Sequence, residues 1–306
     1  MGTPDFAVES LRRIHEGGYN IVGVVTMPDK PAGRGHKLLH SPVKQYAVEH
    51  GLHLMQPPRL KADDFVEELR SLNANLFVVI AFRMLPEVVW SMPELGTFNL
   101  HASLLPKYRG AAPIQWCIIN GETVTGVTTM QMNAGLDTGD MLAKEEVIIT
   151  DSDTGETLHD KLAAAGVNTI RETIKQIEAG TVNPIKQDDN LSCYAPMINK
   201  TTGYIDFTKS AREIYNLVRA LISYPYASTT YCGTRFKLIN AKISDKDFGG
   251  EPGEILDVNK DGILVKCGTG TLLITDVQFE GKKKMPVSEY IKGNTIEKGI
   301  VLGENQ

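Results

Sequence analysis

Short apolar runs alternate with amphipathic segments through the first half of the chain, and this alternation limits the possible folds more than any other feature. Three runs have the β-branched and aromatic composition of buried strands, at residues 21–25, 76–80 and 98–100. Helical patterns stand between them near residues 43–50 and 63–72. Strands separated by helices predict an α/β domain with a parallel sheet, helices on both faces, and ligands at the carboxyl ends of its strands.

The first residues, MGTPDF, have the pattern of a turn between a strand and a helix, and the helix is expected to run to about Ile14. Such a turn normally follows an apolar strand, and that strand is missing ahead of Met1 in this sequence. A single glycine, Gly2, does not make the G-x-G-x-x-G fingerprint that binds dinucleotide phosphates. A nicotinamide-dependent oxidoreductase is therefore disfavoured.

The last hundred residues follow a different pattern. Short strands, separated by turns that contain Gly, Asn or Asp, are predicted at residues 227–231, 235–243, 253–258, 262–267 and 271–279. This spacing is typical of a small barrel of the oligonucleotide-binding (OB) type. A chain of 306 residues is long enough for two cores. We therefore predict a catalytic domain at residues 1–180, a polar linker at 181–203 and an OB-like domain at 204–306.

The composition argues for an ordinary soluble protein. The four cysteines are scattered without a CxxC pair, so a zinc site or a disulfide framework is disfavoured and a reducing cytoplasm is expected. No apolar run is long enough for a membrane span, and no signal peptide opens the chain. A net charge of −5 permits a nucleic-acid partner without requiring one. No exposed apolar stripe stands out, so we expect a monomer.

A set of polar residues accompanies the third apolar run. Asn99 and His101 are two positions apart, so in a strand they lie on the same face and can converge on one small molecule. A second strand, at residues 126–132, leads into a turn that carries Asp137. Each residue alone is more often structural, but an amide donor, a titratable base and a carboxylate together suffice for acyl transfer without a covalent intermediate.

Two basic segments each allow two interpretations. Residues 28–44 are rich in Pro and Gly and carry four cations with a single carboxylate. They form either a solvated surface loop or a mobile basic finger that lies along a phosphate backbone. The lysine run at residues 282–284 is likewise either a solvated guard of a sheet edge or a phosphate contact.

Several long motifs resemble those of the methionyl-tRNA formyltransferase family. They occur in the same order and run essentially from end to end: MGTPDFAV, PDKPAGRGHKL, SPVK, NLHASLLPKYRGAAPIQW, GVTTMQM and GLDTGDML. The resemblance implies a Rossmann-like formyltransferase domain followed by an OB-like, tRNA-binding C-terminal domain. It also implies transfer of the formyl group of 10-formyltetrahydrofolate to the α-amino group of methionine on initiator tRNA.

The resemblance assigns roles to particular positions. Asn99, His101 and Asp137 fall on the catalytic positions of the family. The folate-binding stretch of the family corresponds to Ser103, Leu104, Leu105 and Pro106. The PAGRGHKL loop corresponds to the segment that engages the acceptor end of the tRNA, and within it Arg34 and Lys37 are the expected contacts. No metal is implied. The loop at residues 81–86 is one residue shorter than in the family, and Arg83 stands near a position that is often Gly.

The residues suit this chemistry. An amine that attacks a formyl carbon builds negative charge on one oxygen, and prearranged donors are the largest available help. The Asn99 amide and a protonated His101 can supply two such donors. Asp137 can orient His101, favour its charged form and help to move the proton of the amine, through water, towards N10 of the leaving folate.

Other functions remain as alternatives. The nearest are a folate-dependent formyltransferase that acts on glycinamide ribonucleotide or on an amino sugar nucleotide, and a formyltetrahydrofolate hydrolase with water as the acceptor. The ribonucleotide enzyme would lack the C-terminal barrel, and the PAGRGHKL loop argues against the sugar enzymes. A non-catalytic RNA-binding protein is disfavoured by the intact set of Asn99, His101 and Asp137.

Overall fold

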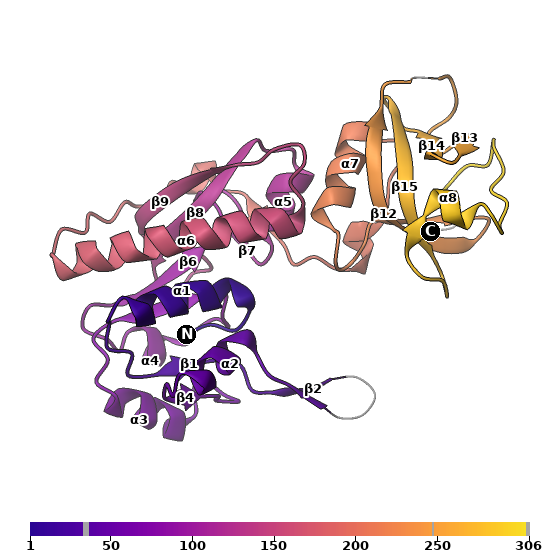
Figure 1. Cartoon of the computed structure of the whole chain (residues 1–306). Coiled ribbons are helices and arrows are strands. Elements are labelled where there is room, and N and C mark those ends of the chain that lie inside the picture. The colour runs from indigo at the N-terminus through magenta and orange to yellow at the C-terminus, as the bar shows by residue number, and fades with distance from the viewer. Residues whose placement is uncertain (33–36, 247, 304–306) are drawn as a thin grey trace. The chain divides into compact units, whose positions relative to one another are not determined.

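A computed structural model describes residues 1–32, 37–246 and 248–303, with the backbone alone at Pro31, Ala32 and Lys37. The chain divides into two compact units (Figure 1). The first comprises Met1–Pro113, Val124–Ile148 and His159–Ala195, and the second comprises Ile114–Thr123, Ile149–Leu158 and the chain from Pro196 onward. Within the described residues, no helix combines the length and the apolar composition needed to cross a bilayer. The predicted domain limits at residues 180 and 204 stay predictions.

The strands of the first unit confirm the predicted α/β fold. Strand β1 (Val24–Val25) pairs in parallel with β4 (Leu54–Met55), and β5 (Phe77–Ile80) pairs in parallel with β6 (Thr97–His101). The sheet continues in the order β5-β6-β8-β9. Strands β8 (Val124–Gln131) and β9 (Met141–Ile148) are antiparallel, because the loop of residues 132–140 is too short for the crossover that parallel strands need.

Met1 and Gly2 lie between β1 and β5. A strand is expected at this place, because the turn at MGTPDF normally follows one. The Gly2 N–H donates to the Val25 carbonyl at 3.0 Å, and the Ile80 N–H donates to the Met1 carbonyl at 2.9 Å. A Cβ atom on Gly2 would stand 2.6 Å from the Cβ of Ala7 and 2.9 Å from the Ile80 oxygen, so a larger residue cannot make this turn. These two residues therefore join the two parallel pairs.

Helices cover the sheet of the first unit. They are α1 (Asp5–Glu16), α2 (Pro42–Glu49), α3 (Asp63–Ser71), α4 (Glu87–Trp90) and most of α6 (Gly155–Glu178). Helix α5 (Pro113–Ile119) lies almost entirely in the second unit. The Thr154 hydroxyl accepts the Thr157 N–H at 3.2 Å and caps α6. Thr129 of β8 and Thr173 of α6 share a buried hydrogen bond of 2.6 Å, so α6 lies against the sheet (Figure 1).

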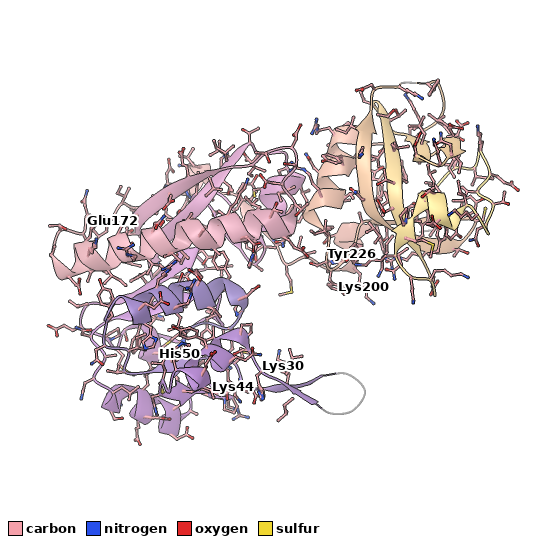
Figure 2. All side chains as sticks on the ribbon, in the orientation of Figure 1. Lys30, Lys44, His50, Glu172, Lys200 and Tyr226 are labelled. Atoms are coloured by element: carbon pink, nitrogen blue, oxygen red, sulfur yellow. The ribbon has the colours of Figure 1, made fainter. Side chains whose placement is uncertain are left out.

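The described part of the basic segment at residues 28–44 contains a pair of short strands, and its last residues begin α2. Strands β2 (Lys30–Ala32) and β3 (Lys37–Leu39) pair antiparallel, and the hairpin projects from the rest of the first unit (Figure 1). Its base is fixed by Asp29, whose carboxylate accepts from the Lys44 ammonium and from the Gln56 amide. These contacts hold the pKa of Asp29 far below its ordinary value. Lys30 and Lys44 lie at this base in Figure 2.

The second unit contains a curled antiparallel sheet and confirms the predicted OB-like fold. Its strands are β11 (Ser228–Tyr231), β12 (Thr234–Ser244), β13 (Ile255–Asn259), β14 (Gly262–Lys266), β15 (Thr271–Phe279) and β16 (Met285–Pro286). The order is β11-β12-β15-β14-β13, with β16 beside β15. A register shift near Asn240 marks a bulge in β12, and a bulge bends its strand and increases the local twist.

Helix α7 (Ala211–Ala220) packs on this sheet, with Ile214 and Val218 in the core. The rings of Phe236, Phe279 and Tyr290 stack in series, with centroids 4.6 and 4.3 Å apart. Tyr290 ends the short helix α8 (Val287–Tyr290). The stack therefore ties the last helix to the sheet.

Residues 149–158 belong to the second unit because α7 holds them. The Arg219 guanidinium donates to the carbonyls of Thr150 and Asp153, at 3.1 and 2.8 Å, and to the Asn216 side chain at 3.0 Å. Burial lowers the pKa of Arg219. The carbonyl partners replace the water that this buried cation has lost.

Ser210 is expected to stabilise α7 as its N-cap. Its hydroxyl accepts the Glu213 N–H at 3.2 Å, and the Glu213 carboxylate accepts the Ser210 N–H at 2.9 Å. Ser210→Ala should lower the free energy of unfolding by about 1 kcal/mol, the usual effect of losing a serine cap. Urea denaturation measures this change, with Ser210→Thr as the control that keeps a hydroxyl. An unchanged free energy in the alanine variant would contradict the assignment.

Candidate active site

Strand β6 presents two different faces. Phe98 and Leu100 are buried, and Leu100 packs against Gly166 of α6, where a Cβ atom would stand 2.6 Å from the leucine. Asn99 and His101 alternate with them and therefore share the opposite face. The Asn99 side chain is half-buried and has no hydrogen-bond partner among the residues that the structure describes. Its carboxamide is available to a substrate.

His101 is held by the loop that follows it. The side chain is only 6% exposed, and its Nε2 lies 2.8 Å from the Tyr108 carbonyl oxygen. A carbonyl only accepts, so Nε2 carries a proton. The other ring nitrogen, Nδ1, lies 3.7 Å from Oδ2 of Asp137. The imidazole is thus fixed on one side and faces a carboxylate on the other.

Asp137 reaches the histidine from the turn between β8 and β9. The backbone N–H of Gly110, in the short strand β7 (Arg109–Gly110), donates to Oδ2 of Asp137 at 2.9 Å. This bond directs the carboxylate towards His101. The structure therefore brings these two predicted residues together, His101 from the end of β6 and Asp137 from a turn, with Asn99 on the same strand face as the histidine.

The loop at residues 103–110 is held by hydrogen bonds, both within the loop and to strands β8 and β9. The Thr128 hydroxyl donates to the Ser103 carbonyl at 2.7 Å and accepts the Leu105 N–H at 3.1 Å. The Ser103 hydroxyl donates to the Lys107 carbonyl at 2.6 Å. The Lys144 ammonium donates to the Leu105 carbonyl, and burial lowers the pKa of this lysine. The loop is anchored to β8 and β9 at several points.

The expected folate-binding residues differ in what they offer a ligand. Ser103 and Leu105 are 0% and 1% exposed, so their side chains shape the loop from within. Leu104 and Pro106 are half-buried and have surface to contribute. Ser103 and Leu105 can therefore serve a ligand only indirectly, through the shape of the loop.

The expected tRNA contacts are only partly described. Arg34 lies outside the described residues, and for Lys37 the structure describes the backbone alone, at the start of β3. In the second unit, the lysine run at 282–284 contributes to a cluster of cations and aromatic rings. The ring of Tyr226, which Figure 2 labels, has its centroid 4.3 Å from the Lys284 Nζ and 5.3 Å from the Lys237 Nζ. One lysine of the run is therefore held against a ring.

The loop at residues 81–86 is held in place by Arg83. Its guanidinium donates to the carbonyls of Pro57 and Pro58, at 2.7 and 3.0 Å. Ala81 adopts a left-handed φ of +47°, which a glycine would adopt more easily. The arginine therefore links this loop to the segment that follows β4.

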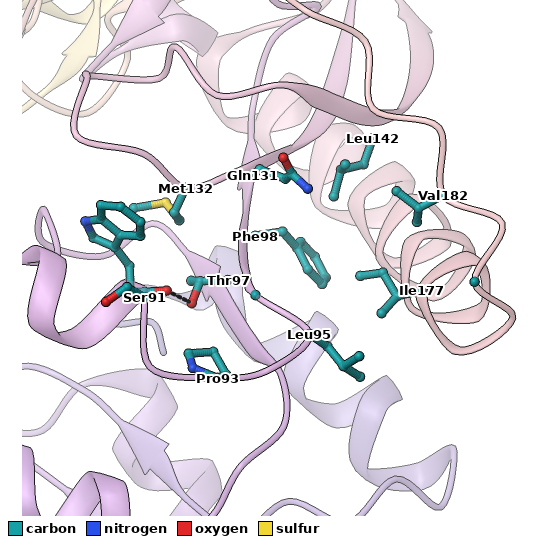
Figure 3. Close-up of a pocket in the computed structure, with 13 residues that line it drawn as sticks. Ser91, Pro93, Leu95, Thr97, Phe98, Gln131, Met132, Leu142, Ile177 and Val182 are labelled. Carbon is teal, nitrogen blue, oxygen red and sulfur yellow. Dashed lines mark hydrogen bonds between the residues drawn. The ribbon is translucent and has the colours of Figure 1, made fainter.

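A separate cavity of about 350 Å³ opens at the amino end of β6 (Figure 3). Its walls include Trp90, Phe98, Met132 and Ile177, and none of its lining residues is acidic, basic or a cysteine. The cavity therefore lacks groups for proton transfer, unlike the carboxyl end of the same strand. Among the described residues, no group of three or more His, Cys, Asp or Glu gathers as a metal site would require.

The segment at residues 185–195 also touches the site. Strand β10 (Tyr194–Ala195) pairs in parallel with β7, and the Cys193 carbonyl accepts the Arg109 N–H at 3.0 Å. A short 3₁₀ turn, η1 (Asp189–Leu191), precedes β10 in the chain. A second 3₁₀ turn, η2 (Lys200–Gly203), follows β10 and belongs to the second unit. The sequence interpretation of a polar linker did not identify these contacts, because an irregular stretch has no periodic signal.

Comparisons with known proteins identify the family of the chain. A formyl transferase family model matches residues 1–174, and a model of the formyl transferase C-terminal domain matches residues 197–295. Methionyl-tRNA formyltransferases of Geobacter metallireducens and Clostridioides difficile are 48% and 50% identical over 304 residues, which cover 99% of this chain and 97% and 98% of theirs. The chain belongs to the methionyl-tRNA formyltransferase family. Its two matched regions fall on either side of the segment that carries β10.

Solved structures share the fold of this formyltransferase at lower identity. An N-formyltransferase from Helicobacter canadensis, in complex with folinic acid and dTDP-3-aminofucose, gives a TM-score of 0.68 at 24% identity over 89% of this chain and 96% of that one. HypX from Aquifex aeolicus, in complex with tetrahydrofolic acid, gives 0.59 at 21% identity over 80% and 43%. At these identities the likeness concerns the fold alone.

The hydroxyl of Thr128 is expected to stabilise the loop of this formyltransferase. Thr128→Val should lower the free energy of unfolding by about 1–3 kcal/mol, because it leaves a buried carbonyl and a buried N–H without their partner. Chemical denaturation tests this. The matched control is Thr125→Val on the same strand, since the Thr125 side chain is buried but makes no hydrogen bond within the described chain. Equal effects of the two substitutions would contradict the proposed anchor.

Proposed function

We propose that the chain transfers the formyl group of 10-formyltetrahydrofolate to the α-amino group of methionine carried by initiator tRNA. One observation carries this proposal. His101 and Asp137 lie together at the carboxyl end of β6, with Asn99 on the same strand face as the histidine, in a chain that is about half identical to methionyl-tRNA formyltransferases over nearly its whole length.

The reaction begins when the amine attacks the formyl carbon and negative charge develops on the formyl oxygen. The Asn99 carboxamide donates to that oxygen and stabilises the charge. Nε2 of His101 is already committed to the Tyr108 carbonyl, so protonation of Nδ1 creates the second donor. The distance of 3.7 Å to Asp137 is longer than a hydrogen bond, which leaves this N–H able to serve the oxyanion.

The tetrahedral adduct then loses the folate. The carbon–N10 bond breaks, N10 receives a proton, and the amine nitrogen gives one up. Asp137 is the base on this path, with water as the carrier between the two nitrogens. The carboxylate stays aimed at the reacting centre because the Gly110 N–H holds it.

The substrates have separate binding surfaces in this proposal. The folate lies against the loop at residues 103–106, with Leu104 and Pro106 as contacts and with Ser103 and Leu105 maintaining the shape of the loop. Folate ligands in the two solved relatives of the same fold support this choice of co-substrate. The acceptor end of the tRNA lies along the β2–β3 hairpin, where Arg34 and Lys37 meet phosphates.

We also propose that the enzyme acts as a monomer in the cytoplasm. Its four cysteines are all free, which suits a reducing compartment. The OB-like unit supplies further contacts to the tRNA, because a fold of this kind commonly binds oligonucleotides.

The decisive assay is formyl transfer from 10-formyltetrahydrofolate to methionyl initiator tRNA, with glycinamide ribonucleotide as a parallel acceptor. We expect transfer to the tRNA, loss of that transfer in His101→Ala, and a raised KM for tRNA with an unchanged KM for folate in Arg34→Ala. Folate turnover without formylated tRNA would favour the hydrolase instead. Transfer to the ribonucleotide would favour the other formyltransferase class.

Asn99→Ala should slow turnover by roughly a hundredfold, since losing one oxyanion donor removes about 3 kcal/mol of transition-state stabilisation. The melting temperature should stay close to that of the wild type, because the Asn99 carboxamide has no partner within the described chain. Single-turnover kinetics with saturating folate and tRNA measures the chemical step. Unchanged turnover would remove Asn99 from the catalytic set.

A further inference from the structure

The segment at residues 185–195 (the strap) is bound along its length to the turn that carries Asp137 and to the loop that contains β7. At its start, Ile185 exchanges two backbone hydrogen bonds, of 2.8 and 2.9 Å, with Met141, which is the first residue of β9. At its end, β10 pairs with β7. The strap therefore connects the end of the Asp137 turn with the loop that holds His101.

Gln187 is the buried polar side chain of the strap. It is 6% exposed, and its Nε2 donates to the carbonyl oxygens of Asp137 and Gly139, at 2.9 and 2.7 Å. The same nitrogen also lies 4.0 Å from the Met130 sulfur, but its two short hydrogen bonds are both to the backbone of one turn. That turn is the one that presents the Asp137 carboxylate to His101.

The backbone of this turn needs such support. Asp137 has a left-handed φ of +53°, a conformation that residues other than glycine rarely adopt. At Gly139, a Cβ atom would stand 1.7 Å from the Gln131 oxygen, so the chain passes very close to β8. A tight path of this kind persists only where the surrounding structure holds it.

Arg109 determines the orientation of the Gln187 side chain. Its Nε donates to Oε1 of Gln187 at 3.0 Å, which leaves the amide nitrogen on the side of Asp137. Its terminal nitrogen donates to Asp189 at 2.8 Å, on the same strap. The next residue, Gly110, holds the Asp137 carboxylate. Strand β7 therefore holds the carboxylate of Asp137, and Gln187 holds its backbone carbonyl.

We propose that Gln187 is a positioning residue for formyl transfer, which acts by holding the Asp137 turn in the conformation that aims the carboxylate at His101. Gln187 contacts the backbone of the turn and makes no hydrogen bond to the side chains of Asn99, His101 or Asp137. Its loss should therefore lower kcat through Asp137 and leave substrate binding nearly unchanged. This inference rests on the proposed function, and in particular on the role of Asp137.

The test compares kcat and KM for both substrates in Gln187→Met, which keeps the length of the side chain and removes its donors. We expect kcat to fall about tenfold or more, with both KM values within about threefold of wild type. Gln176→Met on the exposed side of α6 is the matched control and should behave as wild type. If Gln187→Met does not fold, Gln187→Glu replaces it, because the glutamate keeps the Arg109 partner but has no amide donors, and its kcat should fall similarly.

A double-mutant cycle separates positioning from general damage. If Gln187 acts through the carboxylate, Gln187→Met should cause no further loss of kcat in an Asp137→Asn enzyme. Losses that multiply in the double variant, a kcat within twofold of wild type, or a change confined to KM would each overturn the inference. Full activity of Asp137→Asn alone would instead show that the proposed role of Asp137 is wrong, and the inference would fail with it.

Discussion

The buried hydrogen bond between His101 and the Tyr108 carbonyl is the contact on which the proposed catalytic centre depends. The acceptor is a backbone group, so the orientation of the imidazole follows the path of the loop. That path depends on the Thr128 hydroxyl and on the Lys144 ammonium, which come from β8 and β9. A strand, a loop and two further strands must therefore all be folded before the histidine can face Asp137.

Different residues of the site support its structure and face a ligand. Ser103 and Leu105 are turned inward, where they use their hydroxyl and backbone groups to hold the loop. Asn99 is the opposite case, since its carboxamide keeps no partner within the described residues and is available to a substrate. A rigid support with a few free polar groups suits a reaction that depends on prearranged donors.

Regular periodicity made much of the fold predictable, and irregular backbone made the rest unpredictable. The alternation of apolar runs and helical patterns correctly placed β5, β6, α2 and α3, and the turn-punctuated strands correctly indicated the OB-like sheet. The antiparallel pairing of β8 and β9 did not follow from that alternation, because strand direction depends on the connection. Gln187 was missed because a glutamine in a polar, irregular stretch carries no pattern that separates it from its neighbours.

The sequence alone determined which residues share the face of β6, since neighbouring positions on a strand alternate sides whatever surrounds them. It also determined, through its motifs, the family and the residues to which chemistry was assigned. Only the tertiary structure decided how Asp137 is held, because the partners of this residue come from distant parts of the chain. The Gln187 amide lies 50 residues from Asp137 in sequence, and the Arg109 side chain that orients it lies 78 residues from Gln187. Contacts over such separations arise from packing, and local residue preferences do not encode them.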